Sequence, residues 1–275
     1  MYISEFMSKY YISIDQGTTS SRAVLYDSSF KQITQEQQEF TQHYPAEGLV
    51  EHDPEEIWNS VFNTVISLMS KNGIKSSEVI SIGITNQRET VMLWDKEGKV
   101  LNKAIVWQDR RTADFCEELK GRDVEPEVTE KTGLLLDPYF SATKARWLLK
   151  KHKIDPNKYF FGTIDTFLVW KLTEGKSFKT DVTNASRTSL LNIDSVEWDS
   201  DLIDIFELSG LNLPEVTKNT SDFGSTKLFG GEIKISGIAG DQQASLIGQG
   251  CFATGQLKST YGTGCFLMAN TGKKR

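Results

Sequence analysis

The segment from Asp15 to Ser20 has the residue types of a phosphate-binding turn. It reads Asp-Gln-Gly-Thr-Thr-Ser and separates two apolar stretches, which predicts a strand, a tight turn and a second strand. A glycine turn with consecutive hydroxyl residues directs backbone N–H and side-chain O–H donors at one phosphate oxygen, and an aspartate at a strand end can hold Mg²⁺ through water. A solvated turn without a ligand is the alternative for this segment taken alone.

A second turn of the same kind lies between Ser259 and Phe266, where the sequence reads STYGTGCF. Two such turns could hold a polyphosphate from both sides. Between them, Asp241 directly follows an apolar stretch and opens a predicted helix, whose positive end carries about half a charge and favours an ionised carboxylate. The alternative for Asp241 alone is a helix cap.

Strands and helices that alternate along the chain must position these residues. Strands are predicted at residues 10–14, 22–26, 31–41, 79–85, 90–95, 104–108 and 233–240, and helices at 53–72, 141–151, 165–172 and from 241 onward. The first helix has a clear start, because Asp53 is a natural N-cap and Pro54 suits the first helical position. The strand at 79–85 is so apolar that we expect both of its faces to be covered. The pattern predicts a layered α/β core.

The composition is that of a soluble globular protein. Of 275 residues, 38% are hydrophobic and 25% are charged, and the net charge is −6 without a basic stripe, which disfavours nucleic acid as a partner. Cys116, Cys251 and Cys265 are far apart, which favours reduced thiols, and three scattered histidines disfavour a zinc site. The sequence shows neither a signal peptide nor a run of about 18 apolar residues, so we expect a cytoplasmic protein without membrane insertion.

Eight segments of the chain occur in the order and register of a known family. They are YISIDQGTTSSRAVLYD, EHDPEEIW, GITNQRET, IVWQDRRT, TGLLLDPYFSATK, DVTNASRT, ISGIAGDQQA and YGTGCF. Together they resemble the FGGY carbohydrate kinases, and within that family the bacterial members that phosphorylate glycerol. The resemblance implies an actin-like, ribonuclease-H-like α/β domain, with a mixed sheet flanked by helices, which forms the first lobe of a two-lobe kinase and binds ATP between the lobes.

The resemblance also implies which residues contact each ligand. It places the ATP phosphates against Thr18, Thr19, Ser20, Arg22 and, from the second turn, Thr263, and it places Asp15 in the Mg²⁺ shell. It implies that the glycerol hydroxyls are bound by Arg88, Glu89, Tyr139, Asp241 and Gln242, and that Trp107 and Phe266 flank the carbon skeleton. Asp241 would also be the base that accepts the proton of the attacking hydroxyl.

The adjacent residues Arg88 and Glu89 suit a polyol for a reason that does not depend on the resemblance. A three-carbon triol has little apolar surface, so charged, bidentate hydrogen bonds must recognise it, and this pair supplies donors and acceptors together. The alternative is an exposed turn salt bridge, which is worth less than about 1 kcal/mol. Trp107 and Tyr139, taken singly, would be ordinary core or surface aromatics.

The resemblance divides the chain into a tail at 1–8 that matches nothing, a first-lobe domain at 9–254, and the first hairpin of a second lobe at 255–275. Chains of the family are about twice as long, so the isolated 275-residue chain is expected to be inactive. The full-length form is expected to be a homo-oligomer, either a dimer or a tetramer.

The function that the resemblance implies is ATP-dependent phosphorylation of glycerol to sn-glycerol 3-phosphate, in glycerol uptake and catabolism. One alternative is an FGGY kinase for another polyol or a ketose such as xylulose, which substrate profiling would distinguish. The other is a non-catalytic actin-like binding module, against which the joint presence of Asp15, Arg88, Glu89 and Asp241 counts.

Overall fold

The computed structural model describes residues 9–273, so the predicted tail at 1–8 lies outside the described residues. The larger of its sheets has six strands in the order β14-β15-β6-β1-β2-β3. Their bounds are β1 Tyr10–Gln16, β2 Ser20–Asp27, β3 Gln32–Glu39, β6 Val79–Asn86, β14 Ser225–Thr226 and β15 Ile233–Gly240. The sheet is mixed, because β1 and β15 run parallel to β6 whereas β2 and β3 are antiparallel to their neighbours.

The parallel strands bring three chain segments to one edge of this sheet. In the register of the strands, Gln16 and Gly240 both lie opposite Asn86, so β1, β6 and β15 end side by side. The residues that follow each strand are therefore neighbours in space, although they are distant in the sequence.

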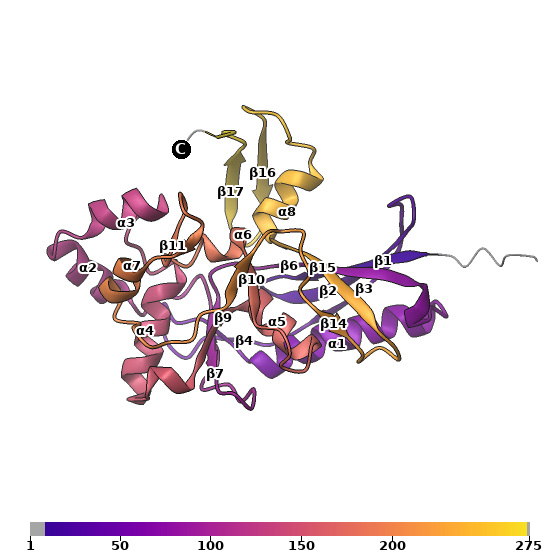
Figure 1. The fold of residues 1–275 in the computed structure, drawn as a ribbon, viewed down its shortest axis with the longest axis horizontal. Coiled ribbons are helices and arrows are strands. Elements are labelled where there is room, and N and C mark those ends of the chain that lie inside the picture. Colours follow the sequence, from indigo (N-terminus) through magenta and orange to yellow (C-terminus); the bar gives the residue numbers. More distant parts are fainter. Residues whose placement is uncertain (1–8, 274–275) are drawn as a thin grey trace, which may run out of the picture.

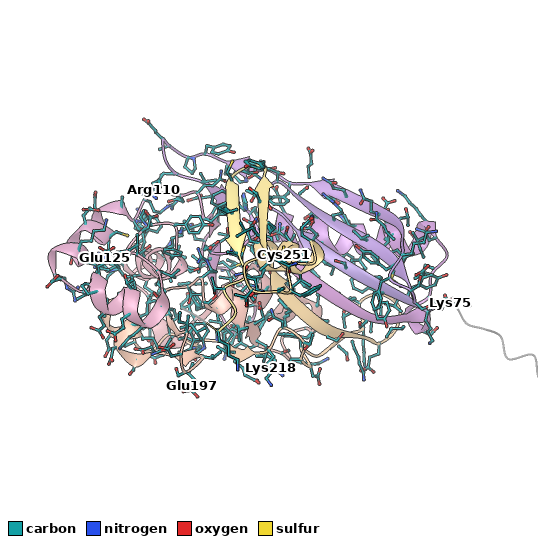
Figure 2. All side chains as sticks on the ribbon, turned by 90° about the horizontal axis from the view of Figure 1, so that it is seen from above. Lys75, Arg110, Glu125, Glu197, Lys218 and Cys251 are labelled. Carbon is teal, nitrogen blue, oxygen red and sulfur yellow. The ribbon has the colours of Figure 1, made fainter. Side chains whose placement is uncertain are left out.

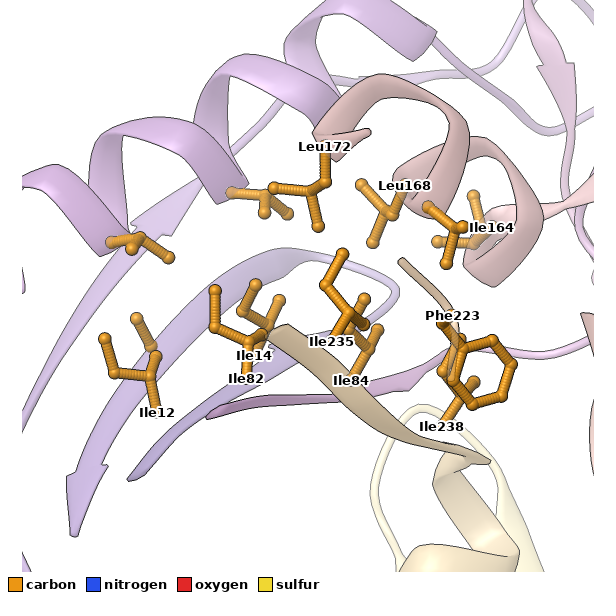
Figure 3. Packing of buried hydrophobic residues seen from close by; sticks show 14 of the residues in the cluster. Ile12, Ile14, Ile82, Ile84, Ile164, Leu168, Leu172, Phe223, Ile235 and Ile238 are labelled. Carbon is orange, nitrogen blue, oxygen red and sulfur yellow. The ribbon is translucent and has the colours of Figure 1, made fainter. Parts of the chain in front are cut away.

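Helices α1 (Pro54–Lys71) and α5 (Ile164–Leu172) cover one face of the six-stranded sheet. Helix α1 begins as predicted, because the Asp53 side chain accepts a hydrogen bond of 2.9 Å from the backbone N–H of Glu55. Figure 3 shows isoleucines of β1, β6 and β15 pointing at Leu168 and Leu172 of α5. These contacts fix the strands relative to one another.

The expectation that both faces of strand β6 are covered is wrong at its start. Ile80 is 40% exposed, while Ile82 and Ile84, which point to the helices, are buried. Ile80 lies where the pairing with β1 shifts register, since Tyr10 pairs with Val79 and Tyr11 with Ser81, and this irregularity leaves one residue of the apolar run exposed.

A second sheet of five strands, in the order β4-β5-β8-β7-β9, carries its own hydrophobic core. The strands are β4 Gln42–His43, β5 Glu51–His52, β7 Val91–Trp94, β8 Ala104–Ile105 and β9 Phe160–Thr163, and the helices around them are α2 Ala113–Gly121, α3 Glu125–Thr132, α4 Ser141–His152 and α7 Ser200–Ile205. The strand predicted at 104–108 is shorter than expected. A turn closed by a hydrogen bond from the Asp109 N–H to the Val106 carbonyl directs the chain out of the sheet.

The remaining elements are short. They are 3₁₀ helices at Ser76–Glu78 and Pro156–Lys158, strands β10 Lys179–Asp181, β11 Leu191–Asn192, β12 Glu197–Trp198 and β13 Glu215–Thr217, helices α6 Val182–Ala185 and α8 Asp241–Gly248, and the hairpin β16 Leu257–Tyr261 and β17 Cys265–Ala269. In Figure 1 the hairpin stands above the two sheets next to α8. No helix among residues 9–273 is long and apolar enough to cross a lipid bilayer.

The hairpin has two different faces. Leu257, Tyr261 and Leu267 project from one face and are more than half exposed, while Lys258 on the other face is buried. Cys251, labelled beside the hairpin in Figure 2, connects it to the domain, because its carbonyl accepts a hydrogen bond of 3.0 Å from Asn270.

Candidate active site

A cavity of about 360 Å³ opens at the sheet edge where β1, β6 and β15 end. Its lining contains every site residue predicted from the sequence, namely Asp15, Thr18, Thr19, Ser20, Arg22, Arg88, Glu89, Trp107, Tyr139, Asp241, Gln242, Thr263 and Phe266, together with Gly17, Thr260, Gly262 and Gly264. The structure thus brings together segments that lie as far apart as residues 15 and 266.

The turn after β1 presents hydroxyl groups and one unpaired guanidinium nitrogen. A hydrogen bond of 2.9 Å from the Gly17 N–H to the Ser20 carbonyl closes the turn, and the Thr18 hydroxyl accepts a bond of 3.0 Å from the Trp107 indole N–H. The Nε atom of Arg22 is buried and has no hydrogen-bond partner among the described residues. An unpaired buried donor is costly unless a ligand accepts from it, so this face of the cavity suits an anion.

Asp15 lies across the β1–β2 pair from Arg22. Burial raises the pKa of the Asp15 carboxyl above its usual value, the charge of Arg22 opposes this shift, and the charge of Asp241 adds to it. The two carboxylates therefore repel each other across the cavity. A bound cation would relieve that repulsion.

Arg88 and Glu89 occupy a strained turn between β6 and β7. Glu89 has a φ of 62°, and the Thr90 N–H donates to the Arg88 carbonyl at 2.7 Å. This three-residue hydrogen bond around a left-handed residue is typical of the classic γ-turn, which is rare and strained. Such strain persists where neighbouring contacts enforce it, and here it directs both charged side chains into the protein.

The alternative of an exposed salt bridge at this dipeptide is wrong. Arg88 is 6% exposed and Glu89 is 1% exposed, and their own Nε and Oε2 atoms are 4.0 Å apart. Other groups hold each charge instead. Arg88 Nη1 donates to Gln243 Oε1 at 3.2 Å, and Arg187 Nε donates to Glu89 Oε1 at 2.7 Å.

Arg88 also lies against the start of α8. Its Nε atom forms an ion pair with Asp241 Oδ1 at 3.2 Å. The geometry of this pair is not that of a hydrogen bond, so the Nε–H has no hydrogen-bond partner in residues 9–273. The approach depends on Gly240, because a Cβ atom there would lie 2.6 Å from Arg88 Cδ.

Asp241 is the first residue of α8, and Gly240 occupies the N-cap position. The Asp241 carboxylate accepts a hydrogen bond of 2.7 Å from the backbone N–H of Gln242, but no side chain caps the helix, so the helix-cap alternative for Asp241 is wrong. It is 36% exposed and lines the cavity. The contact with the Gln242 N–H and a contact with a ligand are compatible, because they use different lone pairs of one carboxylate.

Three aromatic rings enclose one side of the cavity. The Trp107 ring lies 5.7 Å from that of Tyr139 and 5.9 Å from that of Phe266, both edge to face. Gly264 allows this arrangement, since a Cβ atom there would lie 2.6 Å from the Phe266 ring. Burial and the charge of Glu89 raise the pKa of the Tyr139 phenol, which therefore stays protonated as a donor.

The backbone that carries Tyr139 is held by a fully buried lysine. Lys144 Nζ donates to the carbonyls of Pro138, Tyr139 and Phe140, at 2.7 Å for Tyr139 and 3.0 Å for Phe140. Burial lowers the pKa of this lysine to about 7. Three carbonyl acceptors satisfy its donors without a carboxylate hydrogen bond.

Sequence reasoning missed three groups that support the site. Arg187, Lys144 and Lys258 each lie in or next to a segment that carries the family resemblance, but none was singled out. Strand alternation offers a signal for Lys258, because it predicts that Lys258 and Thr260 share the face opposite Leu257. No comparable signal marks Arg187, whose partner Glu89 is 98 positions away.

A pair of buried carboxylates lies behind the end of β15. Asp165 accepts hydrogen bonds from the hydroxyls of Thr163 and Thr180, at 2.5 and 2.7 Å. Asp181 accepts 2.7 Å bonds from the Thr183 N–H and the Asn219 amide. The Thr183 hydroxyl in turn accepts from the Gly240 N–H at 2.8 Å, so this cluster supports the residue that precedes Asp241.

Replacing Asp165 with Asn should change how stability depends on pH. Burial raises the pKa of Asp165 to about 7, and the charge of Asp181 adds to the rise. Between about pH 4 and 7 the folded state therefore holds a proton that the unfolded state has released, and wild-type stability falls as pH increases, by at most about 1.4 kcal/mol per pH unit. D165N cannot ionise, so its unfolding free energy relative to wild type should grow across this window in denaturant titrations.

The control for this prediction is D155N. Hydrogen bonds from Asn157 lower the pKa of the exposed Asp155, so its contribution to stability has the opposite sign and is lost as pH falls. A constant difference between D165N and wild type from pH 4 to 7 would show that Asp165 is ionised throughout the folded state.

Comparison with known proteins shows which family this chain resembles. The model of the "FGGY family of carbohydrate kinases, N-terminal domain" matches residues 10–248. Glycerol kinase of Rhizobium rhizogenes is 55% identical over 274 residues, which cover 97% of this chain and 55% of that protein. Glycerol kinase of Brucella ovis is 53% identical over a match that covers 98% of this chain and 56% of that protein. The chain thus spans about half the length of the curated relatives it matches.

Solved structures agree with the fold. The crystal structure of Plasmodium falciparum glycerol kinase with ADP superposes with a TM-score of 0.90 at 39% identity, covering 97% of this chain and 55% of that one. The crystal structure of gluconate kinase from Lactobacillus acidophilus superposes with a TM-score of 0.87 at 25% identity, covering 94% of this chain and 54% of that one. Both matches support the actin-like first lobe that the sequence predicts. With the family match over residues 10–248, they show that the chain belongs to the FGGY family of carbohydrate kinases.

Proposed function

We propose that this chain forms the first lobe of an ATP-dependent glycerol kinase, an ATP:glycerol 3-phosphotransferase that makes sn-glycerol 3-phosphate. The observation that carries the proposal is the buried Arg88–Glu89 pair facing Asp241 in a cavity that also contains the hydroxyl-rich turn. Similarity to glycerol kinases over 97% of the chain supports the choice of substrate. The chain covers only 55% of such a relative, so we propose the kinase activity for the whole gene product, of which this chain forms one lobe.

Glycerol would lie between the charged pair and the aromatic rings. Arg88 offers donors and Glu89 offers acceptors to adjacent hydroxyls, which is the charge-assisted pattern a triol requires. The protonated Tyr139 phenol adds a donor. Trp107 and Phe266 would cover the carbon skeleton, since their rings are already 5.9 Å apart and bound the same cavity.

The phosphates of ATP would lie on the opposite side, against the turns. Thr18, Thr19 and Ser20 supply hydroxyl and backbone donors, and Thr263 supplies a hydroxyl from the second turn. The buried Nε of Arg22, which lacks a partner in the described chain, fits a phosphate oxygen. These donors are the expected parts of a phosphoryl-transfer site, where catalysis is mostly positioning and electrostatic stabilisation.

Mg²⁺ fits this site as a cation held mainly by phosphates. No group of three or more candidate ligand side chains exists among residues 9–273, but Mg²⁺ in kinases usually uses one or two carboxylates with phosphates and water. Asp15 would hold it, with Asp241 nearby, and the mutual repulsion of these carboxylates favours a cation there. When bound, Mg²⁺ would neutralise charge on the phosphate oxygens.

Asp241 would act as the general base. A terminal hydroxyl of glycerol attacks the γ-phosphorus in line, the bond from that phosphorus to the bridging oxygen of ADP breaks, and the hydroxyl proton passes to Asp241. The Nε atom of Arg88, 3.2 Å from Asp241 Oδ1, would hold this carboxylate in place beside the cavity. The products are ADP and glycerol 3-phosphate.

The rival substrate class is another polyol or a ketose. The fold alone does not decide between them, because the gluconate kinase of Lactobacillus acidophilus has the same fold at a TM-score of 0.87. Turnover of glycerol, xylulose and gluconate by the intact gene product should favour glycerol, whereas a preference for a five- or six-carbon substrate would contradict this assignment.

The proposal also includes a cytoplasmic location and a homo-oligomeric assembly. Cys116, Cys251 and Cys265 are all free thiols, which suits a reducing compartment.

Replacing Asp241 with Asn should lower kcat by about 10²- to 10⁴-fold in the intact gene product, the usual contribution of a general base. The glycerol KM should change much less, because an amide still accepts a hydrogen bond. Coupled-assay kinetics give both values. A kcat within a few fold of wild type would exclude Asp241 as the base.

Replacing Gly240 with Ala should displace Arg88, because the new Cβ would lie 2.6 Å from Arg88 Cδ and 2.8 Å from Cγ. We expect kcat/KM for glycerol to fall roughly ten- to a hundredfold, while the KM for ATP changes little. The matched control is G248A in the same helix, where a Cβ would contact nothing within 4 Å. Equal losses in both variants, or unchanged glycerol kinetics in G240A, would contradict the role of Arg88.

A further inference from the structure

Lys258 is buried beside the site, although it does not line the cavity. It projects from β16 toward α8 and is 5% exposed. Its ammonium donates to Gln242 Oε1 and, at 2.7 Å, to the Thr260 hydroxyl. Within residues 9–273 it forms no ion pair with a carboxylate, so neutral side chains satisfy this buried charge.

The chemistry of the ammonium determines how both partners are oriented. An ammonium only donates, so the Gln242 group that faces it must be the carbonyl oxygen. The NH₂ group of Gln242 then points the other way, where Nε2 lies 3.3 Å from Asp241 Oδ2. In the same way, the Thr260 oxygen accepts from Lys258, which leaves its hydrogen free to donate toward the cavity.

We propose that Lys258 is a positioning residue that makes Gln242 and Thr260 hydrogen-bond donors toward the ligand cavity. This inference rests on the proposed function, in which Asp241 must remain an acceptor for the glycerol proton. If the Gln242 amide turned over, its oxygen would face the Asp241 carboxylate and the two acceptors would repel each other.

The electrostatic surroundings agree with this role. Burial lowers the pKa of the Lys258 ammonium, the charge of Asp241 raises it, and the charge of Arg88 lowers it. Lys258 therefore lies close enough to Asp241 and Arg88 to interact electrostatically with each of them. It also joins the hairpin to α8, so any test must distinguish orientation of Gln242 from simple docking of the hairpin.

The test uses K258M, which keeps an unbranched side chain of similar length without a donor. In the intact gene product, glycerol affinity measured by calorimetry should weaken about tenfold, the usual scale for a hydrogen bond to a charged group. In the Q242A background, K258M should weaken glycerol affinity clearly less than tenfold, because Gln242 is gone and only Thr260 still depends on Lys258. Full additivity of the two substitutions would overturn the inference.

The docking control is M268A. Met268 is the cross-strand partner of Lys258 and does not hydrogen-bond Gln242 in the described chain. Its truncation should leave glycerol affinity within about twofold of wild type. If M268A reproduced the loss seen in K258M, hairpin docking would explain the effect and the inference would fail.

A second readout does not depend on glycerol. In NMR spectra of the 275-residue chain, the Gln242 side-chain amide, assigned by its absence in Q242A, should exchange slowly in wild type and markedly faster in K258M. An unchanged amide signal would overturn the role of Lys258. Failure of the intact wild-type protein to bind glycerol would instead overturn the proposed function, so the two failures are distinguishable.

Discussion

The site depends on placing two opposite charges, Arg88 and Glu89, inside the protein at the end of a central strand. Removing charges from water is costly unless other groups satisfy them. Arg187 binds Glu89 at 2.7 Å, while Gln243 and Asp241 contact Arg88. The strained turn at Glu89 persists because these partners, together with a 2.9 Å bond from the Ser141 hydroxyl to the Glu89 carbonyl, enforce it.

The sheet explains why these partners can meet. Parallel pairing of β6 with β1 and β15 places the residues after each strand at one edge, so the hydroxyl turn, the charged pair and Asp241 become neighbours. Buried amides reinforce the edge, because Asn86 and Asn184 exchange hydrogen bonds of 2.9 and 3.1 Å. The packing of α1 and α5 stabilises the strands from one face only (Figure 3). The cavity lies beyond the ends of β1, β6 and β15, away from this packing.

Local signals predicted much of the fold and the two turns of the site, whereas the family resemblance named most of the other lining residues. The cap at Asp53 fixed the start of α1, and the Asp15–Ser20 and Gly262–Gly264 turns lie where strand and turn residues indicated. The burial of Arg88 and Glu89 could not be derived from an adjacent charged pair, since it depends on Arg187, which is distant in the sequence. The exposure of Ile80 was missed because an apolar run does not reveal a register shift, such as the one opposite Tyr10 and Tyr11. Roles inferred from the family resemblance remain predictions.

The central claim is that this chain contains a preformed glycerol site coupled to the first phosphate turn. The Trp107 indole N–H should respond to both, because its ring bounds the side of the cavity where we propose that glycerol lies, and its nitrogen donates to Thr18 at 3.0 Å. In a glycerol titration of ¹⁵N-labelled protein, the Trp107 indole signal should shift and saturate, while that of the buried Trp94 stays constant. A Trp107 signal that does not respond to glycerol, or that shifts no more than Trp94, would contradict the claim.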